Sequence, residues 1–225
     1  MPDTQTRTDA EFEDDQTARD PTEIAYGELQ TAFDHFNAEL FDSALPPCLI
    51  TLQRRRSSYG YFAPARFRHA DGTGRIDEIA LNPQKWRHLP VEENLATLGH
   101  EMAHLWQHYF GTPSRRGYHN KEWAEKMTSI GLIPSHDGKP GGRQTGQHMM
   151  DYIAKGGRFD RACTSFLTLG YNLSFHDLTD EPEGGQRQNK TKFTCPDCGC
   201  NAWGKPDLNI RCEDCRKKME GTKQQ

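Results

Sequence analysis

Residues 98–105 read LGHEMAHL, and the pattern of apolar residues around this stretch indicates the fold. Apolar residues recur around it at helical spacing, which predicts an amphipathic helix that begins at Pro90 and stops at Gly111. Its buried stripe would consist of Val91, Leu95, Leu98, Met102 and Leu105. At about 100° per residue, His100 and His104 point away from that stripe, toward a surface or a cleft.

The same stretch contains an HExxH motif, His100-Glu101-Met102-Ala103-His104. Residues i and i+4 share one helix face, so both imidazoles can reach one Zn²⁺ at Zn–N distances of about 2.0 to 2.1 Å. Glu101 lies beside that face, where its carboxylate can take a proton from the attacking water instead of binding the metal. A solvated helix face with two surface histidines would have the same spacing, so a third ligand is needed to favour a catalytic zinc site.

His119, in the segment GYHNKEW, is the preferred third ligand because a catalytic zinc needs three protein ligands and one open position. Glu122 is the alternative if the site resembles that of thermolysin-like enzymes. His108 is a further possibility, although an exposed side chain is preferred for it. The metzincin arrangement is excluded, because its glycine and histidine positions are occupied by Gln107 and Phe110.

The chain before the motif predicts a helix and a small sheet. Leucine and phenylalanine residues at steps of four, three and four indicate a helix that ends near Ala44. Asp71-Gly72 marks a turn between the second and third of the segments that are rich in β-branched and aromatic residues, at 48–55, 59–67 and 75–81. With a third helix from about 120 to 130, we expect an α+β domain over residues 23–133, with helices on a three-stranded sheet.

Composition sets the limits of the remaining chain. Its 225 residues can hold one domain and a small module, and its net charge is −4. The first 23 residues carry eight acidic residues against two arginines, a contribution of −6 that leaves the remainder near +2. We predict a disordered acidic tail at 1–22, a glycine-rich linker at 134–189 with local helix around 148–154, and a short tail at 220–225.

Neither a membrane-spanning stretch nor the apolar segment of a signal peptide is present, which predicts a cytoplasmic protein with no membrane partner. Cysteines in such a reducing compartment favour metal binding over disulfides. Two Cys-x-x-Cys knuckles, separated by thirteen residues, predict a structural Zn²⁺ in a zinc ribbon over 190–219, with ligands Cys195, Cys198, Cys212 and Cys215. Cys200 is a spare thiol, while Cys48 and Cys163 are expected to be inert and buried.

Cations and an aromatic side chain surround the ribbon: Lys205, Arg211, Lys217, Lys218 and Trp203. Cations neutralise phosphates and an exposed ring can stack on an unpaired base, so DNA, including single-stranded DNA, is the expected nucleic-acid partner. If Trp203 instead forms the core of the ribbon, the module has only a structural role and does not contact nucleic acid. Arg54-Arg55-Arg56, with Arg66 and Arg68, form a second basic locus on strands near the expected cleft.

Taken together, these motifs resemble the SprT family, which includes the Spartan DNA–protein crosslink proteases. The motifs that carry the likeness are AELFDSALP (38–46), YGYF (59–62), IALNP (79–83), LGHEMAH (98–104) and HNKEW (119–123). The likeness covers residues 24–132 and 190–219, and Asn120 stands where the family often has glycine. The resemblance implies a minimal zincin fold with an unusually open cleft.

The function expected from these observations is zinc-dependent hydrolysis of peptide bonds in proteins that are associated with or crosslinked to DNA. Glu101 would be the catalytic base, and His100, His104 and His119 would hold the zinc. Two alternatives use the same scaffold: a zinc hydrolase that cleaves a non-peptide bond, and a nucleic-acid-binding adaptor. The intact Glu101 counts against the adaptor, which would need the ligands but not that carboxylate. No residue is favoured for stabilising the oxyanion, for which Tyr118 and His108 are candidates.

Overall fold

The computed structural model of the chain describes residues 20–178 and 191–222. It forms two compact units that divide between residues 179 and 180, and each is described by itself. The mixed α+β fold that the sequence predicts is confirmed. Most of the predicted acidic tail lies outside the described residues. Its last two residues, Pro21 and Thr22, already belong to the first helix.

The first unit contains a three-stranded sheet in the order β1-β3-β2. Strand β1 (Leu49–Leu52) runs parallel to β3 (Arg75–Leu81), and β2 (Gly60–Arg68) pairs antiparallel with β3 as the predicted hairpin. Because side chains alternate along a strand, Ile79 and Leu81 of β3 face the helices, whereas Glu78 and Ala80 face the other side. The sheet therefore has an inner face in the core and an outer face away from the helices.

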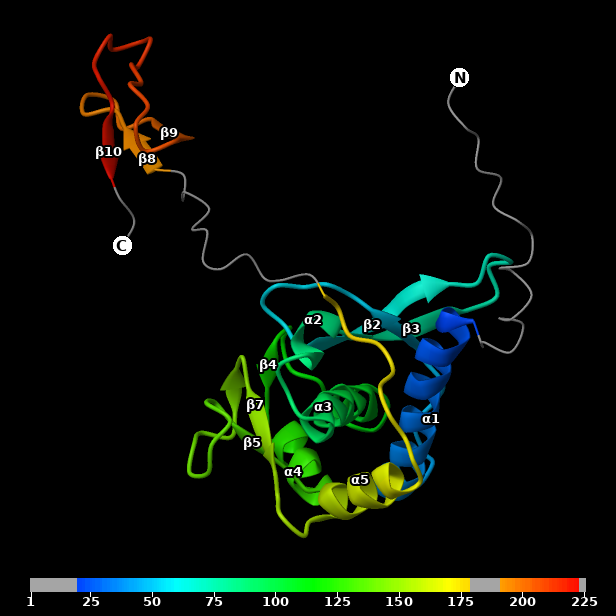
Figure 1. Ribbon diagram of the computed structural model, residues 1–225. Helices are drawn as coiled ribbons and strands as arrows, with labels where there is room; N and C mark the ends of the chain where they lie inside the picture. The colour runs from blue at the N-terminus through cyan, green and yellow to red at the C-terminus, as the bar shows by residue number, and fades with distance from the viewer. Residues whose placement is uncertain (1–19, 179–190, 223–225) are drawn as a thin grey trace, which may run out of the picture. The chain divides into compact units, whose positions relative to one another are not determined.

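Five helices complete the described part of this unit. They are α1 (Pro21–Phe41), α2 (Pro83–Trp86), α3 (Val91–Phe110), α4 (Lys121–Ile130) and α5 (Arg158–Thr168). Helix α3, which carries the HExxH motif, lies at the centre of the unit between the sheet and the helices α4 and α5 (Figure 1). Pro90 precedes the first turn of α3 and Gly111 ends it, as the sequence predicts. Helix α1 ends at Phe41, three residues before the predicted Ala44, because Asp42 and Ser43 adopt positive φ angles.

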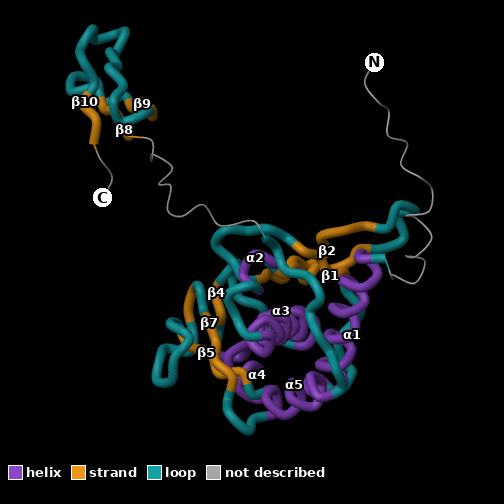
Figure 2. Tube along the Cα trace, in the orientation of Figure 1, coloured by secondary structure: helices purple, strands orange, loops and turns teal. Residues whose placement is uncertain are grey.

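Residues 134–178 do not form the predicted linker. Strand β5 (Leu132–Ser135) pairs with β7 (Met150–Ile153), and the short strands β4 (Tyr118–His119) and β6 (Gly146–Gln147) pair with each other. Figure 2 shows these strands beside α4, on the other side of α3 from α1. The segment around 148–154, expected to be helical, is thus mostly a strand. Gly138, Gly141 and Gly156, which contributed to the linker prediction, adopt positive φ in turns, while Gly184-Gly185 lie outside the described residues.

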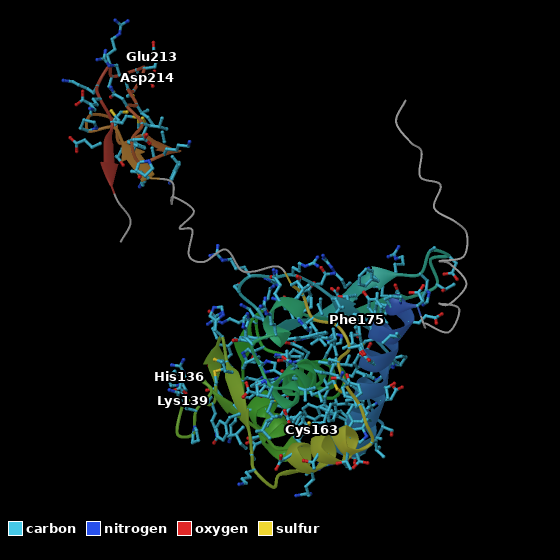
Figure 3. The ribbon with its side chains drawn as sticks, viewed as in Figure 1. His136, Lys139, Cys163, Phe175, Glu213 and Asp214 are labelled. Carbon is cyan, nitrogen blue, oxygen red and sulfur yellow. The ribbon has the colours of Figure 1, made fainter. Side chains whose placement is uncertain are left out.

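Helix α5 closes the core against the back of α3. Phe159 is fully buried and stacks on Phe36 of α1 at a ring-centroid distance of 5.1 Å. Gly99 permits this approach, because a Cβ there would lie 3.3 Å from the Phe159 ring and 2.9 Å from Leu132. Cys163 lies on α5 (Figure 3) with its side chain in this core, which raises the pKa of its thiol to about 12 through burial. The first unit therefore extends well beyond residue 133.

The second unit is a small three-stranded sheet in the order β10-β8-β9. Its strands are β8 (Thr191–Thr194), β9 (Asn201–Gly204) and β10 (Glu220–Thr222). Phe193 and Met219 are buried with Cys195 and Cys212 as its core. Residues 220–222, predicted to be tail, instead pair with β8 and complete the sheet. Within the described residues, no helix is long and apolar enough to cross a lipid bilayer.

Candidate metal centre

Three histidines from two parts of the first unit meet at one point. His100 and His104 come from adjacent turns of α3, and His119 from β4. Each offers a ring nitrogen, and these three atoms lie within 4.8 Å of one another. The Nε2 atoms of His104 and His119 are 3.1 Å apart. Two ligands of a tetrahedral zinc at about 2.05 Å would be roughly 3.3 Å apart, so this donor set fits such an ion.

His119 reaches the other two histidines because the chain turns sharply between α3 and α4. Asn120 caps α4 by accepting a hydrogen bond from the Trp123 N–H at 3.0 Å, and its own amide donates to the Thr112 carbonyl at 3.0 Å. Its φ of −86° requires no glycine. The Asn120 that departs from the family pattern therefore anchors the turn that positions His119.

The alternative third ligands have other partners. Glu122 accepts hydrogen bonds from the Gln107 amide and the Thr112 N–H, both at 2.7 Å, and so ties the end of α3 to α4. His108 lies one turn beyond His104, and its ring is 5.7 Å from that of Phe62. Neither Glu122 nor His108 belongs to the group of possible metal ligands formed by His100, His104 and His119.

Two hydrogen bonds that the sequence did not predict fix the orientation of the imidazoles. Nδ1 of His100 lies 2.9 Å from Oδ1 of Asp151 on β7, and Nδ1 of His119 lies 3.2 Å from the carbonyl oxygen of Gly146 on β6. Each acceptor holds a proton on Nδ1 and leaves Nε2 free to bind a metal. Asp151 is a residue that sequence reasoning missed, because it lies in the segment expected to be a linker and belongs to no motif.

Trp123 of α4 forms the floor of the site. It is fully buried, and its ring lies 4.8 Å from that of His100, 5.2 Å from His104 and 4.3 Å from His119. Contact with all three rings restricts their rotation. Close packing of this kind keeps metal ligands in place when the ion is absent.

The charge state of the imidazoles suits metal binding. Burial, with His100 and His119 as neighbours, holds the pKa of His104 well below its usual value, and burial lowers that of His119 to about 4. Burial also opposes protonation of His100, but Asp151 and Glu101 outweigh it and raise its pKa. Two of the three imidazoles are thus neutral near pH 7, so fewer protons would have to leave when a cation binds.

Glu101 is buried beside the triad, with 5% of its surface exposed. Burial raises its pKa to about 7, although the neighbouring His100 and a hydrogen bond from the Phe62 N–H act in the opposite direction. Gly60 at the start of β2 makes room for it, since a Cβ there would lie 3.1 Å from Oε1 of Glu101 and 2.9 Å from the Ala80 carbonyl oxygen. The carboxylate is therefore confined next to the site, outside the group of ligand atoms.

Thiols gather in the second unit. Ligand sulfurs within 4.8 Å of one another are those of Cys195, Cys198, Cys200 and Cys212. The Sγ atoms of Cys198 and Cys200 lie 3.7 and 3.6 Å from that of Cys212. Cys215 contacts the same cluster through Cys198. Five thiols therefore converge where the sequence predicts four ligands, and Cys200 is the addition.

The two knuckles repeat one backbone pattern, which bears on the choice between Cys200 and Cys215. The Cys195 N–H donates to the Cys200 carbonyl, and the Cys212 N–H donates to the Lys217 carbonyl, both at 2.9 Å. The residue before each acceptor has a positive φ, 71° at Gly199 and 52° at Arg216. Cys200 thus corresponds to Lys217, outside the knuckle, and the repeat favours Cys215 as the fourth ligand.

The surface of the ribbon carries the predicted cations in exposed positions: Lys205, Arg211, Lys217 and Lys218. Trp203 is 59% exposed, and the core of the ribbon is formed by other residues. The alternative in which Trp203 forms this core is therefore wrong.

Similarity to known proteins agrees with this geometry. The SprT-like family matches residues 29–139, a range that contains the three histidines and Glu101 but ends before Asp151. A Salmonella typhimurium protein described as an uncharacterized protein in the mucB 3' region is 51% identical over 59 residues, which are 26% of this chain and 80% of that protein. The chain belongs to the SprT-like family.

Proposed function

We propose that this protein is a zinc-dependent peptidase that hydrolyses peptide bonds in proteins associated with or crosslinked to DNA. The observation that carries the proposal is the position of Glu101, which is buried beside three convergent histidines. A structural metal site would need the ligands alone. A carboxylate kept next to the ligands, at the cost of burying it, is what general-base hydrolysis requires.

The chain's own residues would perform the steps as follows. His100, His104 and His119 would hold the ion through Nε2, with their orientation fixed by Asp151, Gly146 and the ring of Trp123. A zinc bound there would polarise the scissile carbonyl and lower the pKa of the attacking water. Glu101 would take a proton from that water and deliver it to the leaving amine.

Glu101→Gln tests the peptidase. It should keep the zinc and the fold but lose hydrolysis of a protein substrate by a factor on the order of 10² to 10⁴. His119→Ala should lose the metal as well. Glu125→Gln, which changes an exposed glutamate of α4, is the matched control and should keep the zinc content and the hydrolysis rate of the unchanged protein. Full activity of Glu101→Gln would reject the assigned role, while activity only on esters or other non-peptide bonds would favour the alternative hydrolase.

The ribbon supports a nucleic-acid partner, because it carries four exposed cations and an exposed tryptophan. The affinity for DNA should fall as salt rises, with a log–log slope of about −0.7 to −0.9 per phosphate neutralised. Replacing Lys205, Arg211, Lys217 and Lys218 by alanine should flatten that slope. If DNA neither binds the protein nor stimulates cleavage of a DNA-bound protein, the substrate class is wrong and a general peptidase remains.

A further inference from the structure

Positive charge is concentrated on one stretch of the first unit. Residues 49–81 carry six arginines against three acidic residues, in a chain whose net charge is −4. Asp77 and Glu78 are buried, and Asp71 lies in the turn between β2 and β3. All six arginines are exposed, namely Arg54, Arg55, Arg56, Arg66, Arg68 and Arg75, and Asp71 is the exposed acidic residue of this stretch. This surface is therefore basic although the whole chain is acidic.

The loop that contains the first three arginines is fixed by hydrogen bonds from the buried Asn82. The buried amide of Asn82 donates to the carbonyl oxygens of Arg55 at 2.8 Å and Ser58 at 2.9 Å. The Asn82 N–H donates to the Tyr59 carbonyl at 2.8 Å, and its side-chain oxygen accepts from the Gln84 N–H. A loop fixed in this way loses little conformational entropy when a ligand binds.

The far end of the surface contains a pair of like charges. Arg68 and Arg75 lie directly opposite each other on β2 and β3, an arrangement that destabilises an antiparallel pair. Neither has an acidic partner among the described residues. Arg66 lies between the two ends, with Nε 3.9 Å from Oε2 of the buried Glu78 and 66% of its side chain exposed. A bound anion would relieve the repulsion at this end.

Aromatic side chains alternate with these cations. Tyr59 is 42% exposed and Phe67, between Arg66 and Arg68 in the sequence, is 38% exposed. The guanidinium of Arg55 lies over the Tyr61 ring at 5.3 Å. Tyr61 and Phe67 pair with Ala80 and Ile76, which places both on the outer face of the sheet, whereas the adjacent pair Arg68 and Arg75 points to the other face. Exposed rings beside cations suit bases beside phosphates, whereas an acidic peptide would use only the charges.

We propose that the edge strand β2, from the 53–58 loop to Arg68 and its partner Arg75, binds single-stranded nucleic acid. It adjoins the metal centre, because Gly60 follows the loop and the position of its missing Cβ is 3.1 Å from Glu101. The nine residues of β2 span about 30 Å, enough for several nucleotides. A protein attached to the bound strand would therefore lie beside Glu101. The inference deepens the proposed function and rests on it for the substrate only.

Equilibrium binding tests the surface independently of hydrolysis. Fluorescence anisotropy would measure the affinity of the zinc-loaded full chain for a thymidine oligonucleotide of about 20 nucleotides. The test variant is Arg55→Gln/Arg56→Gln/Arg68→Gln, which spares Arg54 and Arg66 because they pair with Asp177 and Glu78. The control removes the same charge elsewhere, by Lys121→Gln/Lys139→Gln/Lys155→Gln.

The arginine variant should bind at least about 10-fold more weakly, and its salt slope should fall by about 0.7 for each lost phosphate contact. The lysine control should change affinity by less than about 3-fold. Equal effects of the two variants, or no effect of the arginine variant, would overturn the proposal. If the triple variant fails to fold, the single charge reversal Arg56→Glu replaces it with the same expected direction.

Base stacking separates nucleic acid from other polyanions. Tyr59→Ala should weaken binding of the oligonucleotide about 5-fold or more, but should leave binding of an abasic strand with the same phosphates unchanged. An equal loss for both strands, or equally tight binding of polyglutamate to the unchanged protein, would reject single-stranded nucleic acid as the ligand. Because no step of this test uses hydrolysis, an inactive protein would leave its outcome intact.

Discussion

Nδ1 of His100 lies 2.9 Å from Oδ1 of Asp151, although the two residues are 51 positions apart in the chain. Helix α3 supplies the histidine and strand β7 supplies the carboxylate. Both side chains are largely buried, at 13% and 12% exposed. The metal site is thus completed by a segment that lies beyond the range matched by the SprT-like family.

Removing this carboxylate should weaken metal binding without removing a ligand. We expect Asp151→Ala to reduce zinc affinity about 10- to 100-fold, measured by competition with a chelator. Asp151→Asn can still accept a hydrogen bond from Nδ1 through its amide oxygen. Its zinc affinity should therefore lie between that of the unchanged protein and that of Asp151→Ala. Asp34→Asn, at an exposed position of α1, is the control. Unchanged affinity in Asp151→Ala would mean that packing alone orients His100.

Gly60→Ala should slow hydrolysis while zinc content stays the same. The new methyl group would lie 2.9 Å from the Ala80 carbonyl oxygen and 3.1 Å from Glu101, and the backbone oxygen cannot rotate away. Glu101 would therefore shift from its position. Gly27→Ala, where a Cβ meets nothing within 4 Å, should leave turnover unchanged and stabilise α1 by about 0.5 to 1 kcal/mol. Normal turnover in Gly60→Ala would show that the sheet adjusts freely.

Glu101 should make the free energy of unfolding of the metal-free protein decrease as pH rises. Its folded pKa of about 7 exceeds the ordinary 4.5, so the stabilisation present below pH 4.5 is lost as pH rises through 7. Glu101→Gln cannot ionise. Relative to the unchanged protein, it should therefore gain stability between pH 5 and pH 8, by up to about 3 kcal/mol. Urea unfolding after chelation measures this, and a relative loss toward pH 8 would contradict it.

The ribbon offers a choice between two thiols that metal analysis can decide. Because Cys200 matches Lys217 in the repeated knuckle, Cys200→Ser should keep two zinc ions per full chain. Cys215→Ser should lose one, or bind it far more weakly. The opposite pattern would assign Cys200 as the fourth ligand. Loss of zinc in neither variant would indicate that the two thiols substitute for each other.

Periodicity and motif spacing predicted the parts of the fold whose signals are local. The apolar stripe of α3, the hairpin of β2 and β3, and the two cysteine knuckles follow from residues close together in the sequence. His119 could also be anticipated, because it precedes a helix that the pattern around Trp123 predicts. These elements are specified by neighbours within one or two turns.

The segment after residue 134 could not be predicted in the same way. Its strands are two to four residues long, too short for alternation to be recognised, and its glycines indicate turns and linkers equally well. Asp151 has a role only because β7 pairs with β5, a contact that no local pattern encodes. The five thiols of the second unit and the exposed aromatic residues posed the opposite problem, since the sequence revealed them but not which of them act together.

The packing of Phe159 against Gly99 has a consequence for the order in which the protein matures during synthesis. Domains generally fold as units while the chain is synthesised from its N-terminal end. The back of α3 stays uncovered until α5 has been made, and His100 lacks its acceptor until residue 151 has emerged. All three histidines are translated by residue 119, some forty residues before the helix that buries their support. A nascent chain therefore contains all three histidines before the residues that orient and support them have been made.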